Sequence, residues 1–193
     1  MSNTDTDIKI TEAYRNYTPP LDVIPVVRML VHYVPHAYLA GLRQIVLANS
    51  SGLARDRRRG KTWRRSQKVR IAEARGLYHA QWKGTPAWIE MFVNNIVEAF
   101  PPMLFRVPLF RDMVFAEVLY HEVGHHIHRT VRPEYQERED VADKWRGVLW
   151  WSFFRRRYWY LWPILYFLVL CLRAGKRVVR LTKKAGSRAD NAT

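Results

Sequence analysis

The stretch VLYHEVGHHIHRT, Val118–Thr130, carries four histidines and one glutamate between His121 and His128. Apolar residues recur at three-to-four spacing through it and just before it, which predicts one long amphipathic helix. These residues are Met113, Ala116, Tyr120, Val123 and Ile127. His121 and His125 are four residues apart, so a helix places them one turn apart on the same face. Two imidazoles placed in this way can bind one Zn²⁺ ion, and Glu122 beside them can take a proton from water that the metal acidifies.

The other histidines of this stretch leave two alternatives open. His128 lies seven residues after His121 and shares its face, so it competes as a metal ligand. His126 points about 100° away from His125 and is not expected to bind the metal. The alternative to a metal site is a histidine-rich helix whose side chains are solvated or packed in the core.

A second helix is predicted over residues 134–154, because four apolar residues lie along one side of it: Ala142, Trp145, Leu149 and Phe153. A catalytic zinc site needs a third protein ligand. Glu139 is predicted to supply it. Asp143 is four residues later on the same face, where it can accept the free N–H of a ligand histidine. The alternative is a solvated acidic turn near the helix N-terminus, which the helix dipole favours.

The segments before these two helices predict an α+β fold. Residues 23–42 are expected to form one or two short helices broken at Pro35. Strands are predicted at Arg43–Asn49, at residues 74–82 and at Ala87–Val93, and the turn KGTP joins the last two. The expected architecture is a small antiparallel or mixed three-stranded sheet, with one helix that carries the histidines and one that carries Glu139.

The sequence predicts three regions. Residues 1–21 form a polar leader without the features of a signal peptide, and residues 22–155 form the metal-binding domain. Residues 156–193 form an apolar aromatic segment followed by a basic tail. The leader could cover the cleft and keep the protein latent, which activity before and after trimming residues 1–20 would decide.

The motifs HEVGH, His121–His125, and EDVAD, Glu139–Asp143, resemble those of the gluzincin metallopeptidases. They are similar in particular to the minimal gluzincins and to membrane proteases whose second motif reads Glu-x-x-Ala-Asp. The resemblance covers the order of elements over residues 22–155 and implies a zinc endopeptidase. The residues that it assigns are the ligands His121, His125 and Glu139, the general base Glu122, and Asp143 as a support for a ligand.

The same resemblance implies two further features. In such enzymes an edge strand before the active-site helix binds extended substrate by β-augmentation. The strand in that place here consists of Trp88, Ile89, Glu90, Met91 and Phe92. The residue that stabilises the transition state in the family is usually a tyrosine or histidine, and Tyr135 and His128 are the candidates.

The formal charge of +15 predicts an anionic partner. Arg55–Arg70 is expected to be a polar loop, and it contains nine basic residues and one aspartate. It suits anionic lipid headgroups, or nucleic acid with Trp63 stacked on a base, and the alternative is a solvated loop. Cys171 is the only cysteine, so zinc ligands must be His, Asp or Glu.

The segment Tyr158–Leu172 has fifteen uncharged, mostly apolar residues with basic residues on both sides. As a helix it would be about 22 Å long, short of the roughly 30 Å hydrocarbon core of a bilayer. A re-entrant or interfacial segment therefore fits better than a span, and the alternative is a core helix or dimer interface. This predicts a cytoplasmic protein that is peripheral or re-entrant at the cytosolic membrane face.

Together these features predict a zinc-dependent endopeptidase that acts on peptide or protein substrates near an anionic membrane surface. The alternative is a zinc-stabilised basic module that binds nucleic acid or anionic lipid without catalysis. A closed site with four protein ligands, for instance with His128 as the fourth, would favour the second, because catalytic zinc keeps one position open.

Overall fold

The computed structural model describes residues 8–64, 67–131, 139–161 and 163. The chain divides into two compact units, Met1–Phe153 and Phe154–Thr193. The first unit contains the sheets and nearly all of the described helices. In the second unit, the described residues are the end of a helix and a short 3-10 helix at Trp159–Leu161.

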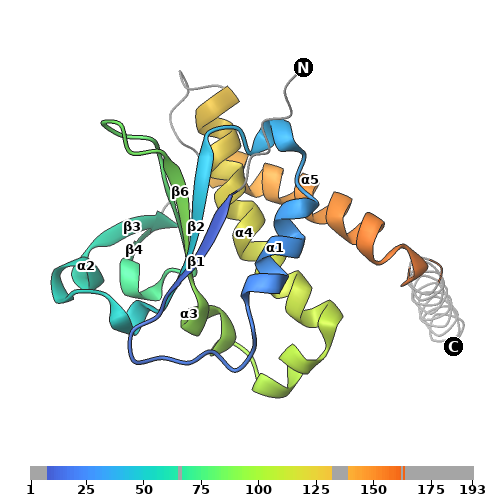
Figure 1. Ribbon diagram of the computed structural model, residues 1–193, viewed down its shortest axis with the longest axis horizontal. Helices are drawn as coiled ribbons and strands as arrows, with labels where there is room; N and C mark the ends of the chain where they lie inside the picture. The colour runs from blue at the N-terminus through green and yellow to red at the C-terminus, as the bar shows by residue number, and fades with distance from the viewer. Residues whose placement is uncertain (1–7, 65–66, 132–138, 162, 164–193) are drawn as a thin grey trace, which may run out of the picture. The chain divides into compact units, whose positions relative to one another are not determined.

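A mixed sheet of four strands forms the centre of the first unit, in the order β1, β2, β6, β5 (Figure 1). β1 (Lys9–Ala13), β2 (Leu42–Ala48) and β6 (Ala87–Phe92) are parallel, and β5 (Gly76–His79) is antiparallel to β6. The α+β class and the mixed sheet are therefore confirmed. The predicted number of strands was wrong, because the sheet has four rather than three.

The additional strand comes from the segment that the sequence analysis treated as a leader. Lys9–Ala13 pairs with Gln44–Ala48 of β2, and Ile8 just before it is buried. The segment KITEA contains no strong alternation of apolar and polar residues, because β1 is an edge strand with mostly exposed side chains. Trimming residues 1–20 would therefore remove a strand of the sheet as well as the segment before it.

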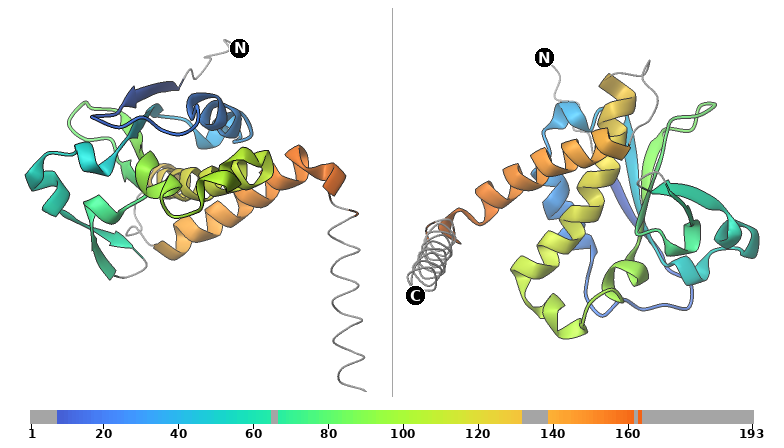
Figure 2. Two further views of the ribbon diagram at one scale, coloured as in Figure 1. Left: turned by 90° about the horizontal axis from the view of Figure 1, so that it is seen from below. Right: turned by 180° about the vertical axis from the view of Figure 1, so that it is seen from behind.

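Two helices cover one face of the sheet, α1 (Ile24–His32) and α4 (Pro108–Val131) (Figures 1 and 2). The side chains on this face include four that are fully buried: Ile45, Leu47, Ile89 and Met91. The hydroxyl of Tyr120 on α4 donates a hydrogen bond to the carbonyl of Leu30 on α1, at 3.1 Å. This bond fixes the helix that carries the histidines against the helix beside it.

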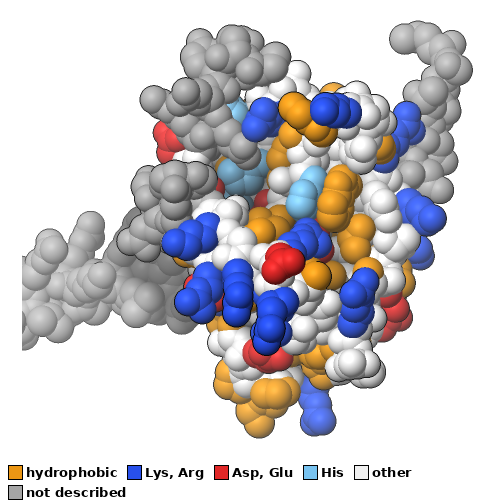
Figure 3. Space-filling view, turned by 90° about the vertical axis from the view of Figure 1, so that its left-hand side faces the viewer, with side chains coloured by type: hydrophobic (Ala, Val, Ile, Leu, Met, Phe, Trp, Pro, Cys, Tyr) orange, Lys and Arg blue, Asp and Glu red, His pale blue; other side chains and the backbone are white. Residues whose placement is uncertain are grey.

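The opposite face of the sheet is covered by the segment predicted to be a polar loop. It forms a short helix, α2 (Arg55–Arg59), and an antiparallel pair, β3 (Lys61–Arg64) and β4 (Gln67–Arg70). A small second core of Ala48, Ala74 and Phe92 lies on this face. Lys and Arg side chains gather over it on the surface (Figure 3). The loop prediction was wrong because charged residues at a surface hairpin leave little apolar periodicity.

The remaining α-helices of the described residues are α3 (Val93–Val97) and α5 (Glu139–Arg157). The predicted long helix with the histidines is confirmed as α4, and its start at Pro108 suits the first helical position. In the described part of the chain, no helix combines the length and the apolar character that a membrane span needs. Most of the predicted interfacial segment, Tyr158–Leu172, lies outside the described residues.

Candidate metal centre

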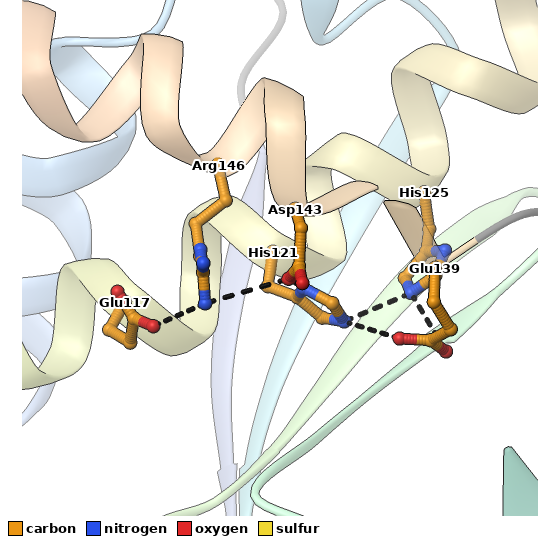
Figure 4. Close-up of polar contacts among 6 residues, drawn as sticks. All are labelled: Glu117, His121, His125, Glu139, Asp143 and Arg146. Carbon is orange, nitrogen blue, oxygen red and sulfur yellow. Dashed lines mark hydrogen bonds and ion pairs between the residues drawn. The ribbon is translucent and has the colours of Figure 1, made fainter. Parts of the chain in front are cut away.

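Three side chains from two helices converge at the candidate metal centre (Figure 4). His121 and His125 project from consecutive turns of α4, and their Nε2 atoms are 3.2 Å apart. Glu139 is the first residue of α5. One of its carboxylate oxygens lies 3.4 Å from His121 Nε2 and the other 3.8 Å from His125 Nε2. The structure thus brings together the three residues that the sequence analysis proposed as ligands.

These separations match what a tetrahedral metal ion requires of its ligands. Zinc bonds of about 2.0–2.1 Å to nitrogen and oxygen place neighbouring ligand atoms about 3.3–3.4 Å apart. His121 Nε2 is close to that separation from both neighbours, at 3.2 Å from His125 Nε2 and 3.4 Å from Glu139 Oε2, and the 3.8 Å between His125 Nε2 and Glu139 Oε1 is somewhat longer. In addition, Glu139 Oε2 is buried and has no hydrogen-bond partner among the described residues. A buried carboxylate oxygen without a partner is costly, and a cation would satisfy it.

The protonation of His121 also suits a metal ligand. Its Nδ1 lies 3.0 Å from a carboxylate oxygen of Asp143, which can only accept, so Nδ1 carries the proton and donates it. The lone pair of Nε2 therefore points at His125 and Glu139. Burial lowers the pKa of His121 well below its ordinary value and the charge of His125 lowers it further, against the opposing effect of Asp143. At neutral pH the imidazole is neutral, as metal binding requires.

Arg146 holds Asp143 in place and is itself paired with the carboxylate of Glu117 (Figure 4). Arg146 forms an ion pair with Asp143 at 3.5 Å, one turn back along α5, and another with Glu117 on α4. The arginine thus bridges the two helices next to the ligands. It fixes the carboxylate that in turn fixes the ring orientation and tautomer of His121. Sequence reasoning identified Asp143 but not Arg146 or Glu117.

Gly124 allows α4 and α5, the two helices that carry the candidate ligands, to approach each other. A Cβ atom at this position would lie 2.6 Å from the carbonyl oxygen of Ala142 and 3.0 Å from its Cα. Both atoms belong to the backbone of α5, so no side-chain rotation could relieve the overlap. The glycine inside the HEVGH motif is therefore a packing requirement that brings Glu139 within reach of the histidines. This role of Gly124 was not predicted from the sequence.

Glu122, the proposed base, lies against the first residue of an edge strand. Its side chain is buried, with 6% of the residue exposed. A Cβ atom at Gly76 of β5 would lie 2.6 Å from Glu122 Oε1 and 2.8 Å from its Cγ. Only a glycine leaves this space to the carboxylate. The strand β5 and the proposed base are thus in direct contact.

The predicted substrate strand, Trp88–Phe92, is not at the edge of the sheet. It forms β6, which pairs with β2 on one side and with β5 on the other. The strand next to α4 that has no further partner among the described residues is β5. The prediction failed because it assumed that the strand nearest to α4 in the chain is also the edge strand of the sheet. The β5–β6 hairpin instead folds the earlier strand outward.

The other predicted residues lie outside the cluster or outside the described residues. His126 has one ring nitrogen 3.1 Å from the Tyr78 hydroxyl and the other 3.0 Å from the carbonyl of Ala40, which agrees with its predicted exclusion from the site. His128 is buried and is not one of the three clustered ligands. Tyr135 lies outside the described residues.

Comparisons of this chain with protein-family models, curated proteins and solved structures found no match.

Proposed function

We propose that this protein is a zinc-dependent endopeptidase of the gluzincin type. The observation that carries the proposal is the convergence of His121, His125 and Glu139, with Glu122 beside them against the edge strand β5. Three protein ligands are the number found at catalytic zinc sites, which keep a further position open. This favours a catalytic site over the alternative of a closed structural site, for which the described residues offer no fourth ligand in the cluster.

The proposed reaction divides the work among a few side chains. When bound, Zn²⁺ supplies Lewis-acid polarisation of a carbonyl and makes water more acidic. Glu122 takes the proton from the attacking water and then delivers it to the leaving amine. Asp143 keeps the proton of His121 on Nδ1, so that Nε2 remains a ligand atom. The largely buried position of Glu122 keeps bulk water away from this proton transfer.

We further propose that β5 binds the substrate. Among the described strands, β5 is at one end of the sheet, and the outer edge of such a strand can hydrogen-bond to an extended peptide. Because Gly76 at the start of β5 touches Glu122, a peptide along this edge would pass next to the base. This role replaces the one first assigned to residues 88–92.

Metal removal tests the proposed function. We expect the full chain to cleave unfolded casein when loaded with zinc, to lose cleavage after chelation, and to regain it when one equivalent of zinc is restored. The reason is that His121, His125 and Glu139 alone cannot activate water. Cleavage is followed by the release of new amino groups. Undiminished cleavage by the chelated protein, or none by the zinc-loaded protein, would contradict the proposal.

The contact between Gly76 and Glu122 gives a second prediction. Gly76→Ala should lower kcat by on the order of 10- to 100-fold, because the new methyl group displaces the carboxylate from its working position. Zinc binding should remain, since the three atoms nearest to the added methyl group all belong to Glu122, which is not one of the three clustered residues. The control is Gly147→Ala on α5, where a new Cβ meets nothing within 4 Å. Equal kcat values for the two variants would show that the position of Glu122 against β5 has no role.

A further inference from the structure

The hairpin formed by β5 and β6 ends in an exposed aromatic and basic tip. Trp82 and Thr85 are bridged by backbone hydrogen bonds, and Lys83 and Gly84 between them both have positive φ, at 44° and 85°. This is a tight two-residue turn with a defined conformation. Trp82 is 70% exposed, and the Lys83 amino group lies 5.7 Å from its ring. The fold thus presents a large apolar ring and a cation to the outside.

A basic face lies on the side of the sheet away from α1 and α4. It is formed by α2, β3 and β4, and we define it by five exposed cations: Arg55, Arg58, Arg59, Lys61 and Arg70. Two acidic side chains are exposed close by, Asp56 and Glu73, so the face has a net positive charge. Figures 1 and 2 show that the β5–β6 hairpin lies on this same side, and Figure 3 shows the cations gathered there.

An ion pair to a buried carboxylate holds the basic face on the sheet. Arg57, the inward residue of α2, forms ion pairs with both oxygens of Glu90 on β6, and His79 on β5 lies 3.4 Å from the same carboxylate. Glu90 is 3% exposed. Burial on its own would raise the pKa of Glu90, but the hydrogen bonds from His79 and Arg57 lower it overall, so the carboxylate stays ionised. The neighbouring arginines are thereby presented from a fixed helix.

We propose that the hairpin tip and the basic face together dock on an anionic membrane surface. Tryptophan and lysine are favoured at the level of lipid headgroups, where the ring can leave water and the amine stays solvated. Arginines near such a surface are attracted by its negative potential. Nucleic acid would account for the cations but does not account for aromatic exposure elsewhere in the chain. The second unit, taken by itself, also exposes Trp159 by 71% and Tyr160 by 54%.

The test is binding of the full chain to vesicles of phosphatidylcholine alone and of phosphatidylcholine with phosphatidylglycerol, measured by flotation over a salt series. We expect binding only to the anionic vesicles. The triple change Arg55→Gln, Arg58→Gln and Arg59→Gln should weaken it on the order of 100-fold, at about fivefold for each arginine. Trp82→Ser should weaken it on the order of 10-fold. Arg57 is left intact because its pair with Glu90 supports the fold.

A matched variant separates location from net charge. Arg28, Arg43 and Arg106 are exposed outside the basic face, and replacing all three with glutamine removes the same charge. This control should bind anionic vesicles within about twofold of the wild type. Equal weakening of vesicle binding in the two triple variants would overturn the proposal. Unchanged binding in both the basic-face triple variant and Trp82→Ser would also overturn it. Tighter binding to a single-stranded or duplex DNA oligonucleotide, lost in the same two variants, would overturn it in favour of nucleic acid.

Discussion

Replacing Glu122 with glutamine is expected to lower kcat/KM for peptide hydrolysis by on the order of 10²- to 10⁴-fold. Glutamine has the same size and shape as glutamate, so it fits the narrow space beside Gly76, but its amide cannot accept a proton from water. Because the side chain at position 122 is not one of the three clustered ligands, the variant should still bind zinc and fold normally.

The comparison requires kinetics, zinc content and thermal unfolding of the same preparations. Glu98→Gln is a suitable control, because Glu98 is exposed at the end of α3 and lies outside the metal cluster. It should leave kcat/KM unchanged. If the Glu122→Gln protein bound zinc and cleaved peptides as fast as the wild type, Glu122 would not be the general base and the proposed mechanism would be wrong.

The second large effect is expected from Gly124→Ala, which changes only the packing of α4 against α5. The new methyl group would overlap the carbonyl oxygen of Ala142 at 2.6 Å, so the helices must separate by about 0.5–1 Å. Overpacking of this kind costs about 1–3 kcal/mol of the free energy of unfolding. The separation also moves Glu139 away from the two histidines, and we expect zinc affinity to fall at least 10-fold.

Gly147→Ala is the matched control for this prediction. It makes the same chemical change on α5 at an exposed position where the added atom meets nothing within 4 Å. It should raise the free energy of unfolding by about 0.5–1 kcal/mol, because glycine is a poor helix former. Denaturant unfolding and competition with a zinc indicator measure both properties. Equal zinc affinity in the two variants would show that the helix crossing at Gly124 does not position Glu139.

The parts of the site that follow from local geometry could be predicted from the sequence. His121 and His125 are related by one turn of one helix, and Glu139 and Asp143 by one turn of the next, so spacing alone places each pair. The apolar periodicity of α4 likewise predicted one long helix through the histidines. These features need no knowledge of how distant segments pack, which is why they agree with the structure.

The features that were missed depend on contacts between distant segments. The edge position of β5 follows from strand order, which chain order does not determine. The β1 strand has too few apolar residues to show a pattern, and its pairing with β2 becomes visible only in the folded sheet. The role of Gly76 depends on its contact with Glu122, and the role of Gly124 depends on its contact with Ala142. Arg146 likewise links α5 to α4 only because Glu117 on α4 lies opposite it.

X-ray absorption at the zinc edge, on the full chain loaded with one equivalent of zinc, tests most directly whether one ion joins α4 to α5. The account predicts two imidazole nitrogens and a carboxylate oxygen at about 2.0–2.2 Å, with the carboxylate lost in Glu139→Ala. A spectrum that shows fewer than two imidazoles, or one that Glu139→Ala leaves unchanged, would contradict it.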